Sequence, residues 1–360
     1  MEVEPAAPLV SVIVRSMGRP SLASALASIA AQSYPRIEVV IVGASGPAHP
    51  APATQCGVHA VRFVASAVPL RRPDAANAGL DAAAGEWITF VDDDDRILVE
   101  HVAGLVAARG EDPGARVIHS LARAVFANGT VETFGQRCSL LQLYERNFIH
   151  LSTVLFSCSL LDEGCRFDPS LDIHEDWDFM LQLAQRTRFR FTPRQTFEWH
   201  ADAGDSGAGG GRNQDAARFA QFRDQVYAKW TGHHDALLAR VQALLQRAGS
   251  AAQRGDHADA AAACREVLAV SPNDPWGLNM LAMVERAAGR LAEAAEAQRR
   301  AVEVRPQDPD LIYNLALLCR DLGDADGASE HCRRALVLAP DNVRYRGLAA
   351  ALATTPIVRH

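Results

Sequence analysis

Short apolar runs alternate with alanine-rich stretches of helical length in the N-terminal part of the chain. The runs are VSVIV at 10–14, EVVIV at 38–42, AVRFV at 60–64 and WITFV at 87–91. Short β-branched runs between helices predict a mostly parallel sheet with helices on both faces. Such sheets bind ligands beyond the carboxyl ends of their strands. The residues that follow each run are therefore the first candidates for chemistry.

Three further segments are defined by their composition. The pair Asn128-Gly129 in FANGTVE predicts a hairpin turn. Residues 201–212, ADAGDSGAGGGR, are too rich in glycine for a regular element and predict a mobile loop. Residues 216–240 favour a helix that links two domains. The α/β domain is therefore expected over 1–215.

The C-terminal part repeats itself with a period of 34 residues. Glycine, alanine and proline each recur in register, at Gly255, Gly289 and Gly323, at Ala260, Ala294 and Ala328, and at Pro272, Pro306 and Pro340. The pattern resembles three tetratricopeptide repeats over 241–342, each a helix, a turn with glycine and a second helix, with a capping helix and tail at 343–360. Such an all-α solenoid presents a surface for peptides or proteins. The alternative is a purely structural cap or a dimerisation element.

Composition narrows the class of protein. The chain has 360 residues, 48% of them hydrophobic and 22% charged, as expected for two globular domains. A net charge of -7 and the lack of a basic cluster argue against a polynucleotide partner. The start, MEVEPAAPLV, is unlike a secretory signal, and no apolar run is long enough to span a membrane. We expect a cytoplasmic protein or one peripheral to the inner face of a membrane.

Cysteine usage indicates neither disulfides nor a zinc site. The seven cysteines are scattered, odd in number and without any C-x-x-C pair. We expect them to be reduced packing residues.

Four consecutive acidic residues, Asp92 to Asp95, follow the run WITFV directly. Carboxylates this close to one another need a counter-ion, and Mn²⁺ or Mg²⁺ with oxygen ligands, completed by water and substrate phosphates, would provide it. The alternatives are a solvated acidic turn, or a helix cap in which Asp95 caps a segment that begins near Ile97.

Three segments together resemble the family 2 glycosyltransferases of the GT-A fold over residues 9–215. They are PLVSVIVRSMGRP at 8–20, RRPDAANAGLDAAAGEWITFVDDDD at 71–95 and GCRFDPSLDIHEDWDFMLQLA at 164–184. The resemblance implies a Rossmann-like α/β domain with a mostly parallel sheet. Its acidic strand end would hold the cation that binds a nucleotide-sugar diphosphate, which implies Asp92 and Asp94 as metal ligands with Asp93 and Asp95 in support.

The same resemblance assigns the remaining candidate residues. Asp176 corresponds to the general base of an inverting enzyme, with Glu175 beside it, although an acid-rich first helical turn would look the same. His200, in FEWH, would complete the metal site. The implied donor-binding residues are Arg15, Ser16, Arg19, Gly43, Arg72, Asp74, Asn77, Asp92 and Asp93.

Two departures concern recognition of the base. The family usually has an aspartate that contacts uracil after the second strand, where this chain has Gly43-Ala44-Ser45-Gly46. It also has Arg15, Ser16 and Met17 where proline, threonine and tyrosine are common. UDP is therefore not implied, and dTDP, GDP or another carrier stays open. Arg15 could replace a lost contact to a phosphate or a base carbonyl.

The expected function is metal-dependent, inverting sugar transfer from a nucleotide-diphosphate donor. A solenoid beside a catalytic domain raises the local concentration of what it binds, so we expect a protein acceptor, flagellin-like or another surface protein. One alternative is a transferase of surface polysaccharide or lipopolysaccharide assembly whose repeats bind a pathway partner. Another is a non-catalytic repeat scaffold with a degenerate transferase domain. A homodimer is compatible with each.

Overall fold

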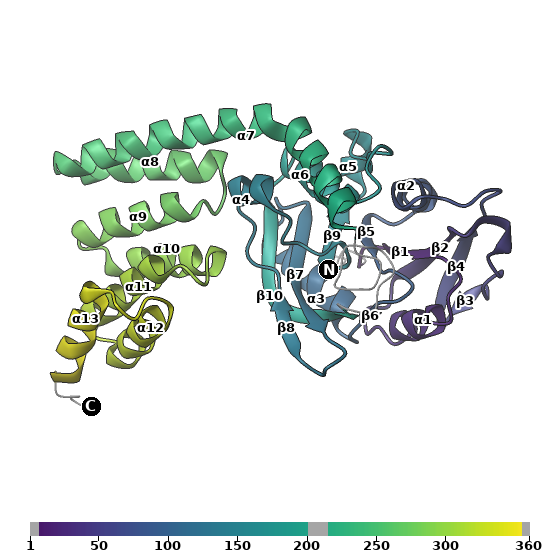
Figure 1. The fold of residues 1–360 in the computed structure, drawn as a ribbon, viewed down its shortest axis with the longest axis horizontal. Helices are drawn as coiled ribbons and strands as arrows, with labels where there is room; N and C mark the ends of the chain where they lie inside the picture. The colour runs from purple at the N-terminus through teal and green to yellow at the C-terminus, as the bar shows by residue number, and fades with distance from the viewer. Residues whose placement is uncertain (1–6, 201–214, 355–360) are drawn as a thin grey trace, which may run out of the picture. The chain divides into compact units, whose positions relative to one another are not determined.

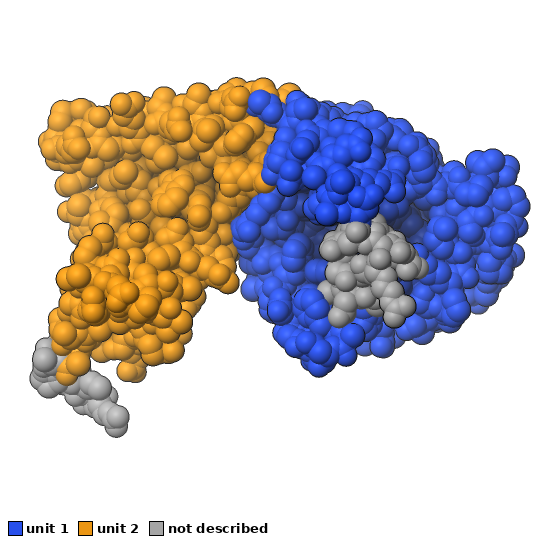
Figure 2. All heavy atoms as spheres, in the orientation of Figure 1, with its two compact units in different colours: residues 1–136, 146–231 blue, residues 137–145, 232–360 orange. Residues whose placement is uncertain are grey.

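A computed structural model describes residues 7–200 and 215–354. The chain divides into two compact units, which Figure 2 colours separately. Unit 1 contains the described residues up to Gln136 and from Arg146 to Thr231, and unit 2 contains Arg137–Glu145 and the described residues from Gly232 onward. None of the helices within these described ranges combines the length and the apolar character that a membrane span requires.

A ten-stranded sheet forms the centre of unit 1 (Figure 1). The strand order is β3-β4-β2-β1-β5-β9-β7-β10-β6, and β8 pairs with β7. The strands are β1 Val10–Ser16, β2 Ile37–Gly43, β3 Gln55–Cys56, β4 His59–Val64, β5 Trp87–Phe90, β6 Arg96–Ile97, β7 Val117–Val125, β8 Val131–Phe134, β9 Val154–Ser157 and β10 Phe189–His200.

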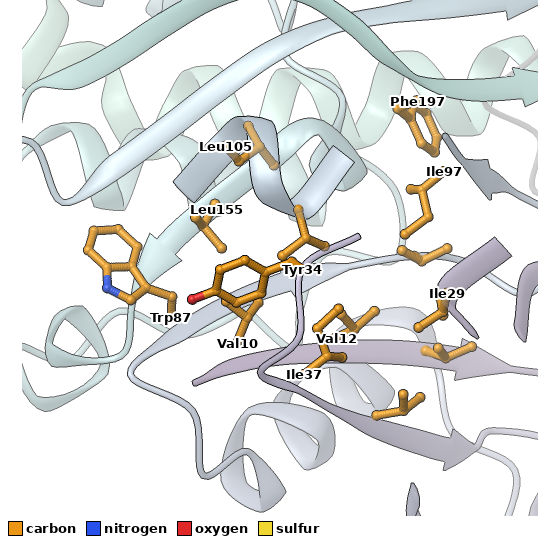
Figure 3. Packing of buried hydrophobic residues seen from close by; sticks show 14 of the residues in the cluster. Val10, Val12, Ile29, Tyr34, Ile37, Trp87, Ile97, Leu105, Leu155 and Phe197 are labelled. Carbon is orange, nitrogen blue, oxygen red and sulfur yellow. The ribbon is translucent and has the colours of Figure 1, made fainter. Parts of the chain in front are cut away.

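Helices cover both faces of this sheet. They are α1 Leu22–Ala30, α2 Arg72–Ala82, α3 His101–Gly110, α5 Ser159–Asp162 and α6 Glu175–Ala184. Val10 and Val12 of β1 pack in one cluster with Ile29 of α1 and Leu105 of α3 (Figure 3). The alternate residue Ile13 faces α2, where Gly79 allows an approach so close that a Cβ atom would lie 2.4 Å from the Ile13 Cγ2. Successive side chains of one strand thus pack against different helices.

The four predicted strands are confirmed. β1 pairs in parallel with both β2 and β5, and β2 pairs in parallel with β4. The turn at Asn128-Gly129 is also confirmed, since it joins the antiparallel strands β7 and β8 and Gly129 has φ +83. Strands β9 and β10, in the other half of the sheet, were not predicted. There β9 runs antiparallel to β5 and β7, and β10 contains Pro193 and a register shift between Phe191 and Gln195.

A single helix, α7 Ala216–Gln253, contributes residues to both units. The helix expected over 216–240 thus continues to Gln253. Within unit 1, Trp230 donates its indole N–H to Asp178 of α6 at 2.8 Å, and the Lys229 ammonium lies 2.9 Å from the same carboxylate. Since α6 begins at Glu175, α7 holds the helix that carries the acidic pair.

Six further helices follow in unit 2. They are α8 His257–Val270, α9 Pro275–Ala287, α10 Leu291–Val304, α11 Pro309–Asp321, α12 Ala325–Leu338 and α13 Val343–Thr354. The three periodic glycines all have φ near +80°, the left-handed conformation that ends a helix, with φ +79, +79 and +81. The three periodic alanines are fully buried where helices cross. The tetratricopeptide pattern is therefore confirmed.

The sequence analysis did not predict the short helix α4, Leu140–Glu145. In the sequence α4 comes between β8 and β9 of unit 1, but it belongs to unit 2. Leu141 packs in a cluster with Val241 of α7 and Val267 of α8. The ring of Tyr144 lies 5.5 Å from that of His234 on α7. Six residues are too few to show a helical period in the sequence. Tertiary contacts therefore decide that this segment is a helix of unit 2.

Candidate active site

The candidate site lies where the carboxyl ends of β1 and β5 meet. The parallel pairing of these strands places Arg15 and Ser16, at the end of β1, beside the acidic residues that follow β5. The first turn of α6 brings Glu175 to the same place. Residues from three distant parts of the sequence therefore form one cluster.

Arg15 connects the strand-end carboxylates to α6. Its Nε and Nη2 donate to the two oxygens of Asp92, both at 2.8 Å, and its Nη1 donates to Glu175 at 3.0 Å. The Arg15 side chain is 8% exposed and that of Glu175 only 1%. Burial raises the pKa of Asp92, but the Arg15 charge outweighs it and holds the pKa at about 2. Arg15 thus links a carboxylate that follows β5 to one at the start of α6.

Asp93 organises the loop after β1. One of its oxygens accepts from the Ser16 hydroxyl at 3.1 Å and from the Met17 amide at 2.7 Å, and the other lies 3.3 Å from Arg19. The Ser16 Oγ also lies 2.8 Å from the His49 Nε2. Asp93 is buried, and these bonds hold the loop after β1. Its role in donor binding stays a prediction.

Asp94 is the most accessible carboxylate of the run. Its side chain is 39% exposed and lies 3.0 Å from Arg19. Burial and then the charges of Asp92 and Asp93 raise its pKa. Asp95 is buried, and burial together with the charges of Asp92 and Asp94 raises its pKa well above the ordinary value. A cation beside Asp94 would relieve this repulsion.

The donor set fits a cation that is completed by its substrate. The cluster contains six carboxylates and three guanidinium groups, namely Asp92, Asp93, Asp94, Asp95, Glu175, Asp176, Arg15, Arg19 and Arg72. Across residues 7–200 and 215–354, no three histidine, cysteine, aspartate or glutamate side chains converge as metal ligands. Mn²⁺ or Mg²⁺ at Asp94 would therefore need ligands from water and a diphosphate, which is their usual coordination.

His200 ends β10 and is exposed. It pairs with Val125 in the β10–β7 ladder. The structure does not bring it into a three-ligand group with Asp92 and Asp94 within the described ranges. Its role as a metal ligand stays a prediction.

The helix-cap interpretation of the acidic run is wrong. Ile97 lies in β6, and the next helix, α3, has Glu100 at its N-cap position. Asp95 therefore caps no helix, and its burial is a feature of the cluster.

Asp176 has the environment of a carboxyl that can change its protonation state. It is partly exposed, and its oxygens accept from the Trp177 amide at 2.7 Å and from the Asn147 side chain at 3.2 Å. Burial and then the charge of Glu175 raise its pKa to about 6, although Arg72 opposes the shift. A base with a pKa just below neutral pH is ionised and still basic enough to take a proton.

The three candidates on α2 have different surroundings. The Nε of Arg72 lies 3.1 Å from Glu175, and the guanidinium is partly exposed. Asp74 pairs with Arg71 at 2.9 Å. Asn77 uses both ends of its amide on the backbone of Phe167, donating at 2.8 Å and accepting at 3.0 Å. Arg72 is thus the member closest to the acidic cluster, whereas Asn77 ties α2 to the loop before α6.

The space beside Gly43 is filled by two rings. A Cβ atom on Gly43 would lie 2.9 Å from Phe63 and 3.2 Å from His49. The His49 ring lies 5.3 Å from that of Phe63. An aspartate could not replace Gly43 without moving both rings, so the departure from the family pattern extends to its neighbours.

His150 belongs to the site but was missed by the sequence analysis. Burial lowers its pKa to about 4, with Asp92 opposing the shift and Arg15 and Arg72 adding to it. Its ring stacks 5.4 Å from Trp199. Its Nδ1 accepts from the Ser152 amide at 3.2 Å, so the neutral ring carries its proton on Nε2. His49 and Asn147 were missed as well, because no motif surrounds them.

Two family comparisons match separate parts of the chain. Residues 11–159 match the glycosyl transferase family 2 sequence model, and residues 285–352 match a tetratricopeptide repeat model. No curated protein matches the chain.

Several solved structures are similar in part. Residues 1–349 of S. aureus TarS are 16% identical with a TM-score of 0.45, and 93% of each chain is covered. The same fragment in complex with UDP-GlcNAc gives 16% identity, 93% coverage of each chain and a TM-score of 0.46. An O-GlcNAc transferase mutant of Thermobaculum terrenum is 27% identical over 34% of this chain, with a TM-score of 0.32. The match spans only 24% of that protein.

Proposed function

We propose that this chain, which contains a glycosyltransferase family 2 domain followed by tetratricopeptide repeats, is a metal-dependent inverting glycosyltransferase that acts on a protein. The observation that carries the proposal is that one cluster contains two different carboxyl groups. Asp94 is an accessible carboxylate at the end of a strand and lies next to Arg19. Asp176 is partly exposed, and its pKa is raised. Sugar transfer needs both charge stabilisation at the departing diphosphate and a base at the acceptor.

The donor side is assigned to the end of β5. Asp94, with Asp92 beside it, would hold the cation, and the cation would stabilise negative charge on the leaving diphosphate. Arg19 is 35% exposed and lies next to Asp94, so its guanidinium can turn toward a phosphate. Arg72 is the second partly exposed guanidinium of the cluster.

The acceptor side is assigned to Asp176. An ionised carboxylate there can take the proton of the acceptor as its oxygen or nitrogen attacks the anomeric carbon opposite the diphosphate. Attack from that face inverts the configuration in a single displacement. The pKa of about 6 means that Asp176 is largely ionised at neutral pH.

The base of the donor stays open in this proposal. Phe63 and His49 fill the volume beside Gly43, where a uracil-binding aspartate is usual in the family. The Ser16–His49 hydrogen bond of 2.8 Å holds that histidine at the end of β1. Recognition of the base is therefore expected to differ from the family pattern.

The protein acceptor is assigned to the exposed face of α9. Trp276 and Met283 are seven residues apart, on the same side of the helix, and are 46% and 37% exposed. The face continues onto α11, since Asn314 donates to Asn279 at 2.9 Å. An exposed aromatic and a methionine beside two side-chain amides suit a peptide, which offers both apolar side chains and backbone hydrogen-bonding groups.

Calorimetry with UDP-, dTDP- and GDP-sugars tests the donor site. We expect one donor to bind at least about tenfold more tightly with Mn²⁺ than with EDTA, because the cation neutralises the diphosphate. Asp94→Asn should remove this dependence. Asp81→Asn, at an exposed aspartate of α2, is the matched control and should retain it. If no donor binds, the protein is a scaffold rather than an enzyme.

A double substitution, Trp276→Ala with Met283→Ala, tests the acceptor. We expect the KM for a protein acceptor to rise about tenfold, since two partly exposed anchors are lost, while hydrolysis of the donor stays unchanged. The measurement is transfer of labelled sugar into the protein, glycan and lipid fractions of an extract. Val337→Ala, on the exposed face of α12, is the control. Label in the glycan or lipid fraction alone would favour the polysaccharide alternative.

A further inference from the structure

Helix α7 is attached to two segments that meet at Asp176. Its first half, in unit 1, holds α6 through the bonds from Trp230 and Lys229 to Asp178, two residues after Asp176. Its second half, in unit 2, packs against α4 through Val241 and Leu141. One continuous helix therefore contacts both the helix that carries the candidate base and the segment that leads to its hydrogen-bond partner.

That partner is Asn147. Tyr144 is buried in unit 2 against His234 of α7, and the chain re-enters unit 1 at Arg146. Asn147 then donates from its Nδ2 to Asp176 at 3.2 Å, and its Oδ1 accepts from the Ile149 amide at 3.1 Å. Phe148, the next residue, is buried in unit 1. In the sequence, Asn147 thus lies between a residue buried in unit 2, Tyr144, and one buried in unit 1, Phe148.

A hydrogen bond and an ion pair hold the α4 segment in unit 2, in addition to its apolar contacts. Asn273, which precedes α9, donates to the Cys138 carbonyl at 3.1 Å. Arg137 pairs with Glu303 of α10 at 2.6 Å. The segment 137–145 is therefore held within unit 2 by residues of the repeats.

We propose that Asn147 is a positioning residue for Asp176, through the hydrogen bond that its side-chain amide donates to that carboxylate. The proposal rests on Asp176 being the base of the proposed function, but the contacts it invokes exist without substrate.

The groups around Asp176 show how the hydrogen bond from Asn147 should affect the pKa of this carboxyl. Glu175, next to it in sequence, raises its pKa, and Arg72 and Arg15 lower it. The Trp177 amide donates to one carboxylate oxygen and Asn147 donates to the other. A hydrogen bond to the ionised form favours ionisation, so removing the Asn147 donor should raise the apparent pKa.

The test is Asn147→Asp. This isosteric change retains the oxygen that accepts from Ile149 but replaces the donor with a like charge. We expect the Asp176 carboxyl carbon, labelled at aspartate Cγ and assigned by its loss in Asp176→Asn, to titrate about one pH unit higher. Asn128→Asp is the matched control, because Asn128 makes the same turn with Thr130 in the exposed β7–β8 hairpin. An unshifted titration in Asn147→Asp would overturn the positioning role.

This measurement uses the full chain without donor, acceptor or metal. A failure of the donor calorimetry would therefore sink the proposed function and leave the contact between Asn147 and Asp176 testable on its own. Conversely, donor binding with an unshifted Asp176 titration would support the enzyme and reject the positioning role of Asn147.

Discussion

Replacing Asp176 by asparagine is expected to lower the rate of sugar transfer about a thousandfold while donor binding is retained. The asparagine amide is nearly isosteric with the carboxylate but cannot take a proton, and positioned general bases contribute roughly 10²–10⁴-fold. Asp176 is not among the residues that approach Asp94, so the affinity for donor and Mn²⁺ should change little. The measurement is kcat for transfer together with donor calorimetry.

The pH dependence of the wild-type enzyme provides a second check on this assignment. Since the pKa of Asp176 is raised to about 6, transfer should rise with pH through that value and level off above it, as the carboxyl becomes ionised. The residual activity of Asp176→Asn should lack this step. Asp162→Asn, at an exposed position of α5, is the control and should retain both rate and pH profile.

Replacing Asp176 by asparagine should raise the stability of the protein although it lowers the activity. The folded pKa of about 6 lies above the ordinary 3.8, so the contribution of Asp176 to stability is present below pH 3.8 and is lost as pH rises through 6. Asparagine has no charge to bury. Asp176→Asn is therefore expected to melt at a higher temperature than the wild type at pH 8, with the difference shrinking toward pH 4. A less stable variant with full transfer activity would show that Asp176 is only part of the helix start.

Replacing Arg15 by methionine is expected to cost unit 1 about 3 kcal/mol of unfolding free energy. Methionine keeps much of the apolar length, but Asp92 loses both of its Arg15 bonds. The buried Glu175 loses one of the two guanidinium partners that it has within the described residues. Removing one partner of a buried ion pair typically costs 3–5 kcal/mol, since the other charge is left without compensation. Urea unfolding followed by tryptophan fluorescence measures the loss.

Two variants separate this effect from ordinary loss of charge. Arg19→Met removes a guanidinium that is 35% exposed, and such pairs contribute less than about 1 kcal/mol. Combining Arg15→Met with Asp92→Asn and Glu175→Gln removes the unpaired charges and should recover most of the stability. If Arg15→Met instead retains wild-type stability and loses only donor affinity, Arg15 faces the donor, as the sequence suggested, rather than linking the carboxylates.

Local patterns were sufficient for much of the fold. The β-branched runs identified β1, β2, β4 and β5 because a buried parallel strand must be apolar on both faces. The 34-residue register identified the repeats because each repeat packs only on its neighbours, so glycine and alanine recur where a turn or a helix crossing recurs. By contrast, β10 carries Pro193 and several polar residues, and its assignment depends on pairing with β7.

The sequence by itself determined which residues could carry chemistry, namely the acidic run after β5 and the acidic pair at the start of α6. The tertiary structure decided what each of them does. It placed Arg15 between Asp92 and Glu175, which are 77 and 160 residues away, and it brought Asn147 to Asp176. A carboxyl's protonation depends on burial and on charges brought close by folding. Motif spacing records neither, so the difference between a pKa of about 2 at Asp92 and about 6 at Asp176 appears only in the folded chain.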